Sequence, residues 1–134
     1  MTGATGFVGK ALVQRLLAED ESRRLVVAVR RGGQLWPEQV LPIVTGNLKP
    51  STDWSIAFKG VAVVVHSAAR VHVMQDTEAD PLAAFRAVNV DGTLNLARQA
   101  AAAGVKRFVF ISSVKVNGES TLPGRAFTAD DIPA

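Results

Sequence analysis

Short apolar runs alternate along the chain with longer segments whose apolar residues recur every three or four positions. The first longer segment covers residues 7–18, where Val8, Leu12 and Leu16 are spaced four apart, as on one face of a helix. A second, rich in Ala and Leu, covers residues 81–103. The apolar runs predict strands at residues 25–29, 40–45, 61–66 and 107–112, and residues 52–58 predict a short helix.

Local signals mark the ends of the long second helix. Asp80 is a favourable N-cap, Pro81 suits the first helical position, and Gly104 stands where a left-handed glycine commonly follows a helix. Gly92 lies inside the helix, where glycine costs about 1 kcal/mol relative to alanine. We therefore expect close packing or a nearby ligand to require a glycine at this position.

The order of these elements predicts the fold. Strands that alternate with helices form right-handed βαβ units, in which a parallel sheet carries helices on both faces. Pro42 cannot donate a ladder hydrogen bond, so the strand at residues 40–45 is expected at the sheet edge. Beyond Asn117 the chain is polar and contains several Gly and Pro residues, which is typical of a surface loop or tail. The prediction is one α/β domain over residues 1–134, with a doubly wound, Rossmann-like parallel sheet.

Composition excludes several classes of protein. The 134 residues, 48% of them hydrophobic, match one domain with a buried core, and the absence of Cys excludes disulfides, thiolate metal sites and a cysteine nucleophile. No apolar run is long enough to span a membrane, and the start lacks the layout of a signal peptide, so we expect a cytoplasmic protein without membrane partners. The net charge of +3 owes much to a few arginines at residues 23–31, too weak a cluster to predict nucleic-acid binding.

The segment TGATGFVGK places Gly3, Gly6 and Gly9 directly before the first helix. Glycines at this spacing allow a tight turn, close approach of the backbone to a pyrophosphate, and close packing of helix on sheet, while the helix N-terminus adds unpaired N–H groups. A P-loop fits less well, because five residues instead of four separate Gly3 from Gly9, and Ala11 stands where Ser or Thr would hold magnesium. The loop predicts a dinucleotide site, with a P-loop-like phosphate binder as a third and weaker alternative.

The end of the strand at residues 25–29 bears on which dinucleotide is bound. In dinucleotide sites this strand end meets the adenosine ribose, where an acidic residue binds both hydroxyls of NAD. Here Arg30 and Arg31 follow the strand, and arginine can pair in a bidentate way with a 2′-phosphate and stack on adenine. The sequence therefore favours NADP, with NAD as the alternative, and Trp36 could report binding by its fluorescence.

Four motifs in sequence order resemble those of a known family. They are TGATGFVGK, VVVHSAARVH, FRAVNVDGTLNLARQA and GVKRFVFISSVKVNGE, which together extend over nearly the whole chain. The chain resembles the extended short-chain dehydrogenase/reductases and, more narrowly, the NAD-dependent epimerase/dehydratase family that acts on nucleotide sugars. The resemblance implies that the intact enzyme would transfer hydride between NAD(P) and a nucleotide-diphosphate sugar, as an epimerase, a dehydratase or a 4-keto reductase.

The resemblance also implies roles for single residues. Ser113 matches the catalytic serine or threonine that hydrogen-bonds the substrate oxygen, although a serine at a strand end can instead make a local backbone bond. Asn47 stands where the family has an adenine-binding Asp, and Asn89 matches an asparagine that supports the active site. The implied cofactor residues are Gly3, Thr5, Gly6, Phe7, Val8, Gly9, Asn47, Leu48, Ser67, Ala68, Ala69, Asn89 and Ser112, beside Arg30 and Arg31. The substrate candidates are Arg70, His72, Lys115 and Val116.

Two features depart from the family pattern. The chain contains no Tyr, so the family's Tyr-x-x-x-Lys pair is absent and no other residue supplies an equivalent base. The apolar strand that forms the sheet centre in this fold would precede Thr2, which follows Met1 directly. We therefore expect a fragment of a longer protein that is inactive alone, with exposed strand edges that favour a homodimer or other self-association. The alternative to an enzyme part is a dinucleotide-binding sensor without catalytic activity.

Overall fold

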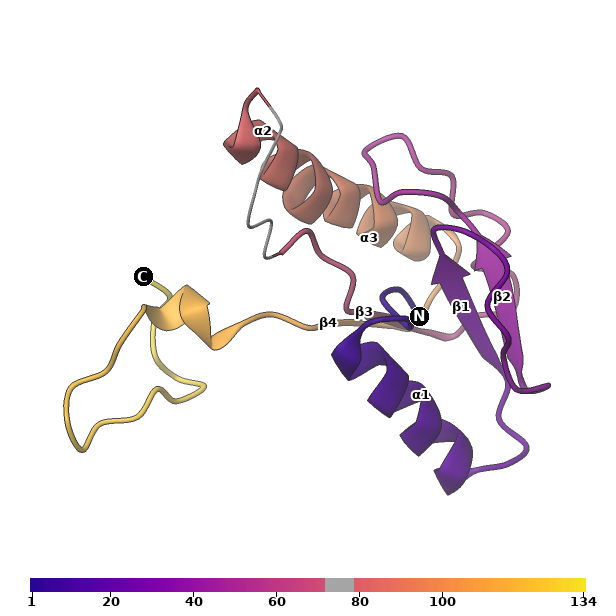
Figure 1. The fold of residues 1–134 in the computed structure, drawn as a ribbon, viewed down its shortest axis with the longest axis horizontal. Helices are drawn as coiled ribbons and strands as arrows, with labels where there is room; N and C mark the ends of the chain where they lie inside the picture. The colour runs from indigo at the N-terminus through magenta and orange to yellow at the C-terminus, as the bar shows by residue number, and fades with distance from the viewer. Residues whose placement is uncertain (72–78) are drawn as a thin grey trace.

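A computed structural model of the chain describes residues 1–71 and 79–134. It contains five helical segments and four strands, and Figure 1 shows α1 on one side of the strands and α3 on the other. In chain order the elements are α1 (Phe7–Glu19), β1 (Leu25–Val29), β2 (Val40–Val44), β3 (Val63–His66), α2 (Pro81–Arg86), the π-helical turn η1 (Ala87–Gly92), α3 (Thr93–Ala102), β4 (Arg107–Phe110) and the 3-10 turn η2 (Val114–Asn117).

The strands are parallel, as the alternating pattern predicts. β1 pairs with β2 and β3 pairs with β4, while Thr2 forms parallel bridges with Ala28 of β1 and with His66 of β3. The order across the sheet is therefore β2, β1, residues 1–2, β3 and β4. Pro42 lies in β2 and pairs with Val27 of β1. Within the described residues β2 is an outer strand of this order, which confirms the expected place of Pro42 at an edge.

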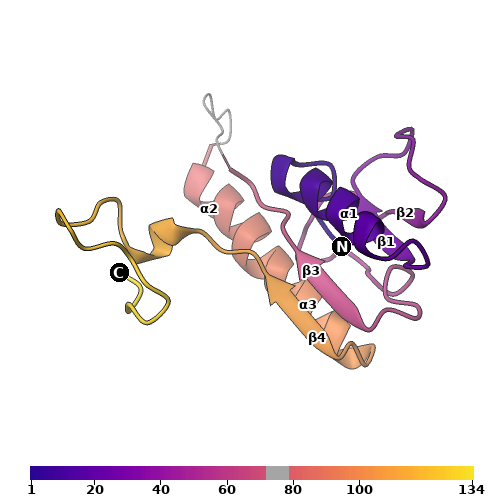
Figure 2. The same ribbon diagram turned by 90° about the horizontal axis from the view of Figure 1, so that it is seen from below.

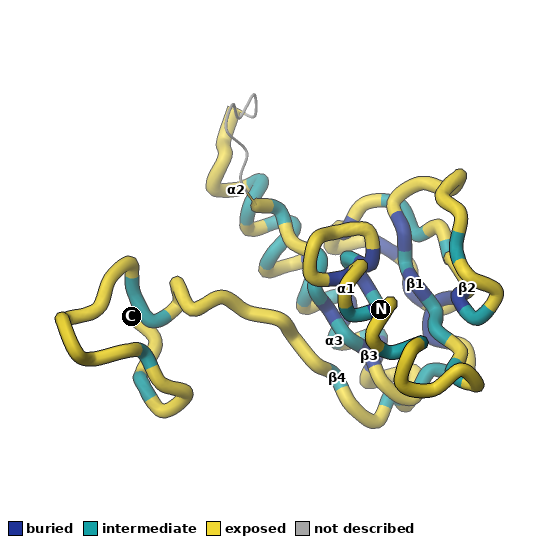
Figure 3. Tube along the Cα trace, turned by 60° about the horizontal axis from the view of Figure 1, so that its bottom comes forward, coloured by how far each residue is buried: buried dark blue, intermediate teal, exposed yellow. Residues whose placement is uncertain are grey.

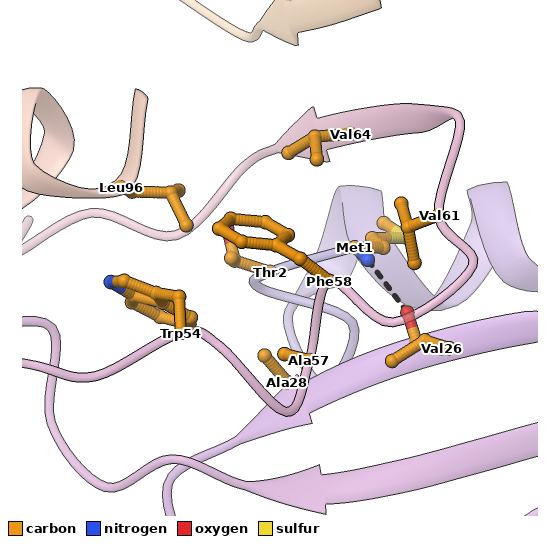
Figure 4. A pocket seen from close by; sticks show the side chains of 10 residues that line it. All are labelled: Met1, Thr2, Val26, Ala28, Trp54, Ala57, Phe58, Val61, Val64 and Leu96. Atoms are coloured by element: carbon orange, nitrogen blue, oxygen red, sulfur yellow. Dashed lines mark hydrogen bonds between the residues drawn. The ribbon is translucent and has the colours of Figure 1, made fainter. Parts of the chain in front are cut away.

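Residues 1 and 2 join the two strand pairs by backbone hydrogen bonds. The Ala28 N–H donates to the Met1 carbonyl oxygen (2.8 Å), and the Thr2 N–H donates to the Val65 carbonyl oxygen (3.0 Å). The Met1 nitrogen also donates to the Val26 carbonyl oxygen at 2.6 Å, the contact drawn in Figure 4. The cavity shown there has a volume of about 20 Å³, the space of a single water molecule, so the side chains around the sheet centre are closely packed.

Each face of the sheet has its own buried core. α1 connects residue 2 to β1 on one face, and the α2–η1–α3 segment connects β3 to β4 on the other, as Figures 1 and 2 show from two sides. The core on the α1 side consists of Ala4, Val13, Val27, Val29 and Val40. The core on the α3 side consists of Leu48, Trp54, Ala57, Phe58, Val64, Leu96 and Ala100. Two crossovers on opposite faces make the fold doubly wound, which confirms the predicted Rossmann-like class.

The predicted ends of the second helical segment are confirmed. The Asp80 side chain accepts a hydrogen bond from the Ala83 N–H (2.9 Å), and Pro81 opens the helix. At the other end Gly104 has φ +78°, and its N–H donates to the Ala101 carbonyl oxygen. The Val105 N–H donates to the Ala100 carbonyl oxygen, which completes a Schellman motif.

The short helix predicted at residues 52–58 does not form, and that prediction is wrong. These residues make successive turns, in which the Phe58 N–H donates to the Trp54 carbonyl oxygen at 3.1 Å. The Trp54 N–H is held by the Gln99 side chain (2.9 Å), and Trp54 and Phe58 are both buried in the core on the α3 side. The burial of the Trp54 and Phe58 rings in this core therefore overrides the weak local preference of residues 52–58 for a helix.

The segment after β4 leaves the body of the domain. Figures 1 and 2 both show η2 and the residues beyond it extending away from the sheet, and Figure 3 shows them mostly exposed. The segment folds back on itself, because the Ala134 N–H donates to the Val116 carbonyl oxygen (2.8 Å) and Arg125 pairs with Asp131 at 3.2 Å. This matches the predicted surface loop or tail. No helix among the described residues is long and apolar enough to cross a membrane.

Gly92 is buried where η1 meets α3, against the loop that follows β2. A Cβ atom at this position would lie 2.9 Å from Leu48 Cγ and 3.3 Å from the Leu48 carbonyl carbon. Leu48 is itself buried in the core, so it has little freedom to move aside. Close packing, one of the two expected reasons for a glycine inside the helix, is therefore present.

We predict that Gly92→Ala destabilises the protein, against the ordinary preference of a helix for alanine. The added methyl group overpacks the contact with Leu48, which should lower the free energy of unfolding by about 1–3 kcal/mol. Urea denaturation followed by circular dichroism measures the change. Asp91→Ala is the matched control, since Asp91 is exposed at the neighbouring position and should change stability by less than about 0.5 kcal/mol. A Gly92→Ala variant more stable than the parent would contradict the packing explanation.

Candidate functional site

The glycine loop forms a tight turn between the sheet centre and α1. Gly3 has φ +72°, a left-handed conformation that favours glycine, and the Gly6 N–H donates to the Gly3 carbonyl oxygen at 3.0 Å. A Cβ atom on Gly9 would lie 2.0 Å from that same carbonyl oxygen, so only a glycine allows the first turn of α1 to pack on the loop. The predicted tight turn and the predicted close packing of helix on loop are both present.

The N-terminus of α1 fits an anion. Gly6 is the N-cap and offers no capping side chain, and the first turn contains no acidic residue. Thr5, Phe7 and Val8 are exposed around it. The first N–H groups of a helix have no partner within the helix, and the helix dipole favours negative charge at this end. A pyrophosphate therefore fits the loop by charge, by hydrogen-bond donors and by the space that the glycines leave.

Thr2 stands at the start of the glycine loop and is held by three successive residues, the last residue of β3 and the two that follow it. The Ser67 hydroxyl donates to the Thr2 carbonyl oxygen (2.9 Å), and the Ala68 N–H donates to Thr2 Oγ1 (3.3 Å). His66 Nδ1 lies 2.6 Å from the same Oγ1. Ser67 and Ala68, which were expected to contact the cofactor, bind Thr2 in this structure and thereby position the start of the loop.

His66 is fully buried at the end of β3. Its Nε2 atom lies 2.9 Å from the Thr93 hydroxyl on α3, and the rings of Phe108 and Phe110 flank it, with centroids 6.1 Å and 5.7 Å away. Burial lowers the pKa of His66 to about 4, so the imidazole is neutral at physiological pH.

Asn89 lies in the π-helical turn and binds the backbone of the loop after β3. Its Oδ1 accepts a hydrogen bond from the Arg70 N–H (2.7 Å), and its Nδ2 donates to the Arg70 carbonyl oxygen (2.9 Å). The Arg70 guanidinium lies over the Phe85 ring of α2, 5.3 Å from its centroid. Asn89 thus holds this loop, and single π-turns such as η1 are frequent at functional sites.

The loop after β2 is anchored to α3 by side-chain amides. Asn95 and Gln99 each donate to the Thr52 carbonyl oxygen at 2.8 Å, and the Thr52 hydroxyl donates to the Asn47 carbonyl oxygen at 2.7 Å. The Asn47 side chain is exposed, whereas Leu48 is buried against Gly92. The Leu48 side chain therefore belongs to the core, and only its backbone is available to a cofactor.

Arg30 and Arg31 are exposed directly after β1. The parallel bridge between Thr2 and Ala28 sets the register, so Arg30 follows β1 at the level of the glycine loop. The two arginines thus lie at the same carboxyl edge of the sheet as the loop, where ligands of open α/β sheets bind.

The candidates after β4 lie at the start of the segment that contains η2, which Figures 1 and 2 show extending away from the sheet. Ser113 is exposed and caps η2, where its hydroxyl accepts a hydrogen bond from the Lys115 N–H at 3.2 Å. Lys115 pairs with Glu119 (3.1 Å), and Ser112 and Val116 are exposed. Ser113 thus makes the local backbone bond that was its alternative role. His72 lies outside the described residues.

Three residues that were not among the sequence candidates link the glycine loop to α3. Thr2, His66 and Thr93 form the hydrogen-bonded chain from the glycine loop to α3. One signal was available for His66, since a polar residue that ends an otherwise apolar run calls for a buried partner. Within residues 1–71 and 79–134 no group of three His, Asp or Glu side chains could hold a metal ion.

Comparisons with known proteins agree with this geometry. A sequence profile described as the NAD dependent epimerase/dehydratase family matches residues 1–133. UDP-glucose 4-epimerase of Vibrio cholerae is 48% identical over 131 residues, which are 98% of this chain and 39% of that protein. A 3-beta-hydroxysteroid dehydrogenase of Mycolicibacterium neoaurum is 34% identical over 134 residues, which cover 92% of this chain and 36% of that protein.

A solved structure extends the similarity to three dimensions. A short-chain dehydrogenase/reductase superfamily protein from Agrobacterium tumefaciens, solved with bound NAD, superposes with a TM-score of 0.75 at 32% identity, over 99% of this chain and 38% of that one. The chain thus spans about two fifths of the length of these relatives.

We predict that Gly9→Ala removes dinucleotide binding. Its methyl group would meet the Gly3 carbonyl oxygen, so the loop must move away from the helix N-terminus. Isothermal titration with NAD and NADP measures the effect, with circular dichroism to show that the variant folds. Lys10→Ala is the matched control, because Lys10 is the exposed neighbour and would be essential only in a P-loop. If Lys10→Ala abolished binding and Gly9→Ala did not, the assignment of the loop would be wrong.

Proposed function

The chain belongs to the NAD-dependent epimerase/dehydratase family, and we propose that it forms the dinucleotide-binding part of an enzyme that modifies nucleotide sugars. One observation carries the proposal: an uncapped helix N-terminus follows a loop whose glycines leave room for a pyrophosphate. The 48% identity to a UDP-glucose 4-epimerase, against 34% to a steroid dehydrogenase, supports a nucleotide sugar as the substrate class.

Each part of the proposed site has a distinct task. The glycine loop and the first turn of α1 would bind the pyrophosphate, and Asn47 and the Leu48 backbone would contact the adenine. The loop of Ser67, Ala68 and Ala69 would pass the cofactor, and Asn89 holds this loop in place by binding the Arg70 backbone. Thr5 and Ser112 are further proposed contacts of the cofactor, and Ser113 is the proposed contact of the reacting oxygen. The proposed contacts of the sugar are Arg70, His72, Lys115 and Val116.

The chain by itself supplies binding rather than a complete reaction. A bound nicotinamide would supply hydride transfer at a sugar carbon. The residues of this chain would position both partners, but without Tyr the chain has no phenolic base. We therefore expect the 134-residue chain to bind a dinucleotide and to leave a UDP-sugar unconverted. The gene sequence downstream separates the two proposals, since a Tyr-x-x-x-Lys segment supports an enzyme and its absence supports the dinucleotide-binding sensor.

Arg30 and Arg31 support NADP as the preferred cofactor, with NAD as the alternative. Both guanidinium groups are exposed at the strand end beside the glycine loop and can pair with a 2′-phosphate. The neighbour from Agrobacterium tumefaciens carries NAD, which supports the alternative. Trp36 packs partly buried against the core on the α1 side, close in sequence to both arginines, and its fluorescence can follow either titration.

We predict that Arg30→Gln combined with Arg31→Gln weakens NADP binding about 10-fold to 100-fold and leaves NAD binding within about twofold. The reason is the loss of charge-assisted hydrogen bonding to the 2′-phosphate, a contribution of about 1.5–3 kcal/mol in total. Fluorescence titration at fixed ionic strength measures both dissociation constants.

The matched control for this variant is Arg23→Gln combined with Arg24→Gln. It changes the net charge equally at the opposite end of β1, before Leu25. Both affinities should stay close to those of the parent protein. Equal loss of NADP affinity in the two double variants would show a general charge effect, and tighter binding of NAD than NADP by the parent would refute the preference.

We also propose that this chain self-associates through β4. Within the described residues β4 pairs with β3 alone, so its outer edge is open. Val109 is 36% exposed, and Phe110 and Ile111 are 53% and 42% exposed. An open apolar edge of this kind pairs readily with a second strand. A second copy of the chain can present the same edge in a two-fold arrangement.

Light scattering should therefore give a mass above the 14.2 kDa of the single chain at micromolar concentration. Val109→Lys should shift the protein toward the monomer, because a charge on an edge strand opposes pairing. Leu35→Lys places the same charge on an exposed loop residue and should leave the mass unchanged. A monodisperse monomer of the parent protein would refute self-association.

A further inference from the structure

The glycine loop begins at Thr2, which makes three contacts with residues at the end of β3 and directly after it. Thr2 is 5% exposed, and its Oγ1 atom lies within hydrogen-bond distance of both the Ala68 N–H (3.3 Å) and His66 Nδ1 (2.6 Å). Its carbonyl oxygen accepts the Ser67 hydroxyl at 2.9 Å. Gly3, the first glycine of the loop, is the next residue, so whatever fixes Thr2 also sets where the loop starts.

His66 extends this contact to α3, on the same face of the sheet. Its second ring nitrogen lies 2.9 Å from the Thr93 hydroxyl, at the start of α3. Thr2, His66 and Thr93 thus form one hydrogen-bonded chain from the glycine loop to the helix. This hydrogen-bonded chain lies on the α3 side of the sheet and links residues far apart in sequence, 64 positions for the first contact and 27 for the second.

The surroundings of His66 keep the imidazole in one orientation and uncharged. Its described contacts are the Thr2 and Thr93 hydroxyls and the Phe108 and Phe110 rings, none of which carries a charge. The side chain is fully buried, and burial lowers its pKa to about 4. A neutral imidazole has one donor and one acceptor nitrogen, so it can link two hydroxyl groups at a fixed distance.

We infer that His66 is a positioning residue that holds the glycine loop in its dinucleotide-binding geometry by linking Thr2 to Thr93. The inference rests on the proposed binding of a dinucleotide at this loop. His66 itself touches no phosphate in this arrangement and acts through Thr2. Cofactor affinity should therefore depend on a hydroxyl group on α3, on the face of the sheet opposite to α1.

Thr93→Val tests the link because valine keeps the shape of threonine and removes the hydroxyl group. It should weaken dinucleotide binding about fivefold, the order expected for one lost hydrogen bond. Thr93→Ser keeps the hydroxyl and should restore the affinity to within about twofold of the parent. Isothermal titration of the 134-residue chain with NAD and NADP measures both.

Leu96→Val is the matched control for a general loss of stability. Leu96 is buried on the same helix, one turn beyond Thr93, and makes no part of the hydrogen-bonded chain. The variant should lower the melting temperature at least as much as Thr93→Val, because it leaves space in the core. Its dinucleotide affinity should stay within about twofold of the parent protein.

Nitrogen-15 NMR of the His66 ring gives a readout that needs no ligand. In the parent protein the ring should show one predominant neutral tautomer and should not titrate between pH 8 and pH 5.5. Thr93→Val should change the two ring nitrogen shifts, and the amide exchange of Gly3 and Gly6 should become faster. Thr93→Ser should keep the parent values of both.

The outcomes separate this inference from the proposed function. If the parent chain binds neither NAD nor NADP, the proposed function fails and the inference fails with it. If the parent binds and Thr93→Val binds equally well with altered ring shifts, only the inference is overturned. It is equally overturned if Leu96→Val weakens binding as much as Thr93→Val at equal loss of stability.

Discussion

The hydrogen bonds of residues 1 and 2 to the strands on either side are the constraint on which the rest of the structure depends. The Met1 carbonyl oxygen accepts from Ala28 of β1, and the Thr2 N–H donates to Val65 of β3, so two residues hold two strand pairs in one sheet. The glycine loop follows at once. Its position relative to both halves of the sheet is therefore fixed at its first residue, and the space before α1 keeps the shape that suits a pyrophosphate.

A single helical segment then positions the loops that surround this space. Asn89 holds the loop after β3 through Arg70, and Thr93 reaches Thr2 through His66. Farther along, Asn95 and Gln99 hold the loop after β2 through Thr52. Loops are mobile and carry function, and a rigid element that binds their backbones reduces the entropy that a ligand must remove. This explains why the helix has polar residues among the apolar ones that cover the sheet.

The geometry of the glycine loop and of the helix ends could be predicted because these features are local in sequence. The tight turn is predicted by the spacing of Gly3, Gly6 and Gly9, and the ends of the helical segment are predicted by Asp80 and Gly104. Residues 52–58 could not be predicted in this way, since the burial of Trp54 and its bond to Gln99 decide their turns. Ser113 matches a family motif, yet in this structure its hydroxyl binds the Lys115 N–H. A motif gives residue types, and the distances between them depend on the fold.

The sequence alone determined the class of fold, the parallel order implied by alternating elements, the edge position of β2 and the glycine loop. These features follow from local preferences of the backbone, which a short stretch of residues carries. Only the tertiary structure decided that Leu48 requires a glycine at residue 92 and that His66 joins Thr2 to Thr93. Such contacts join residues separated by 27 or more positions in the sequence, and a local sequence pattern cannot predict which partner a buried polar group will have.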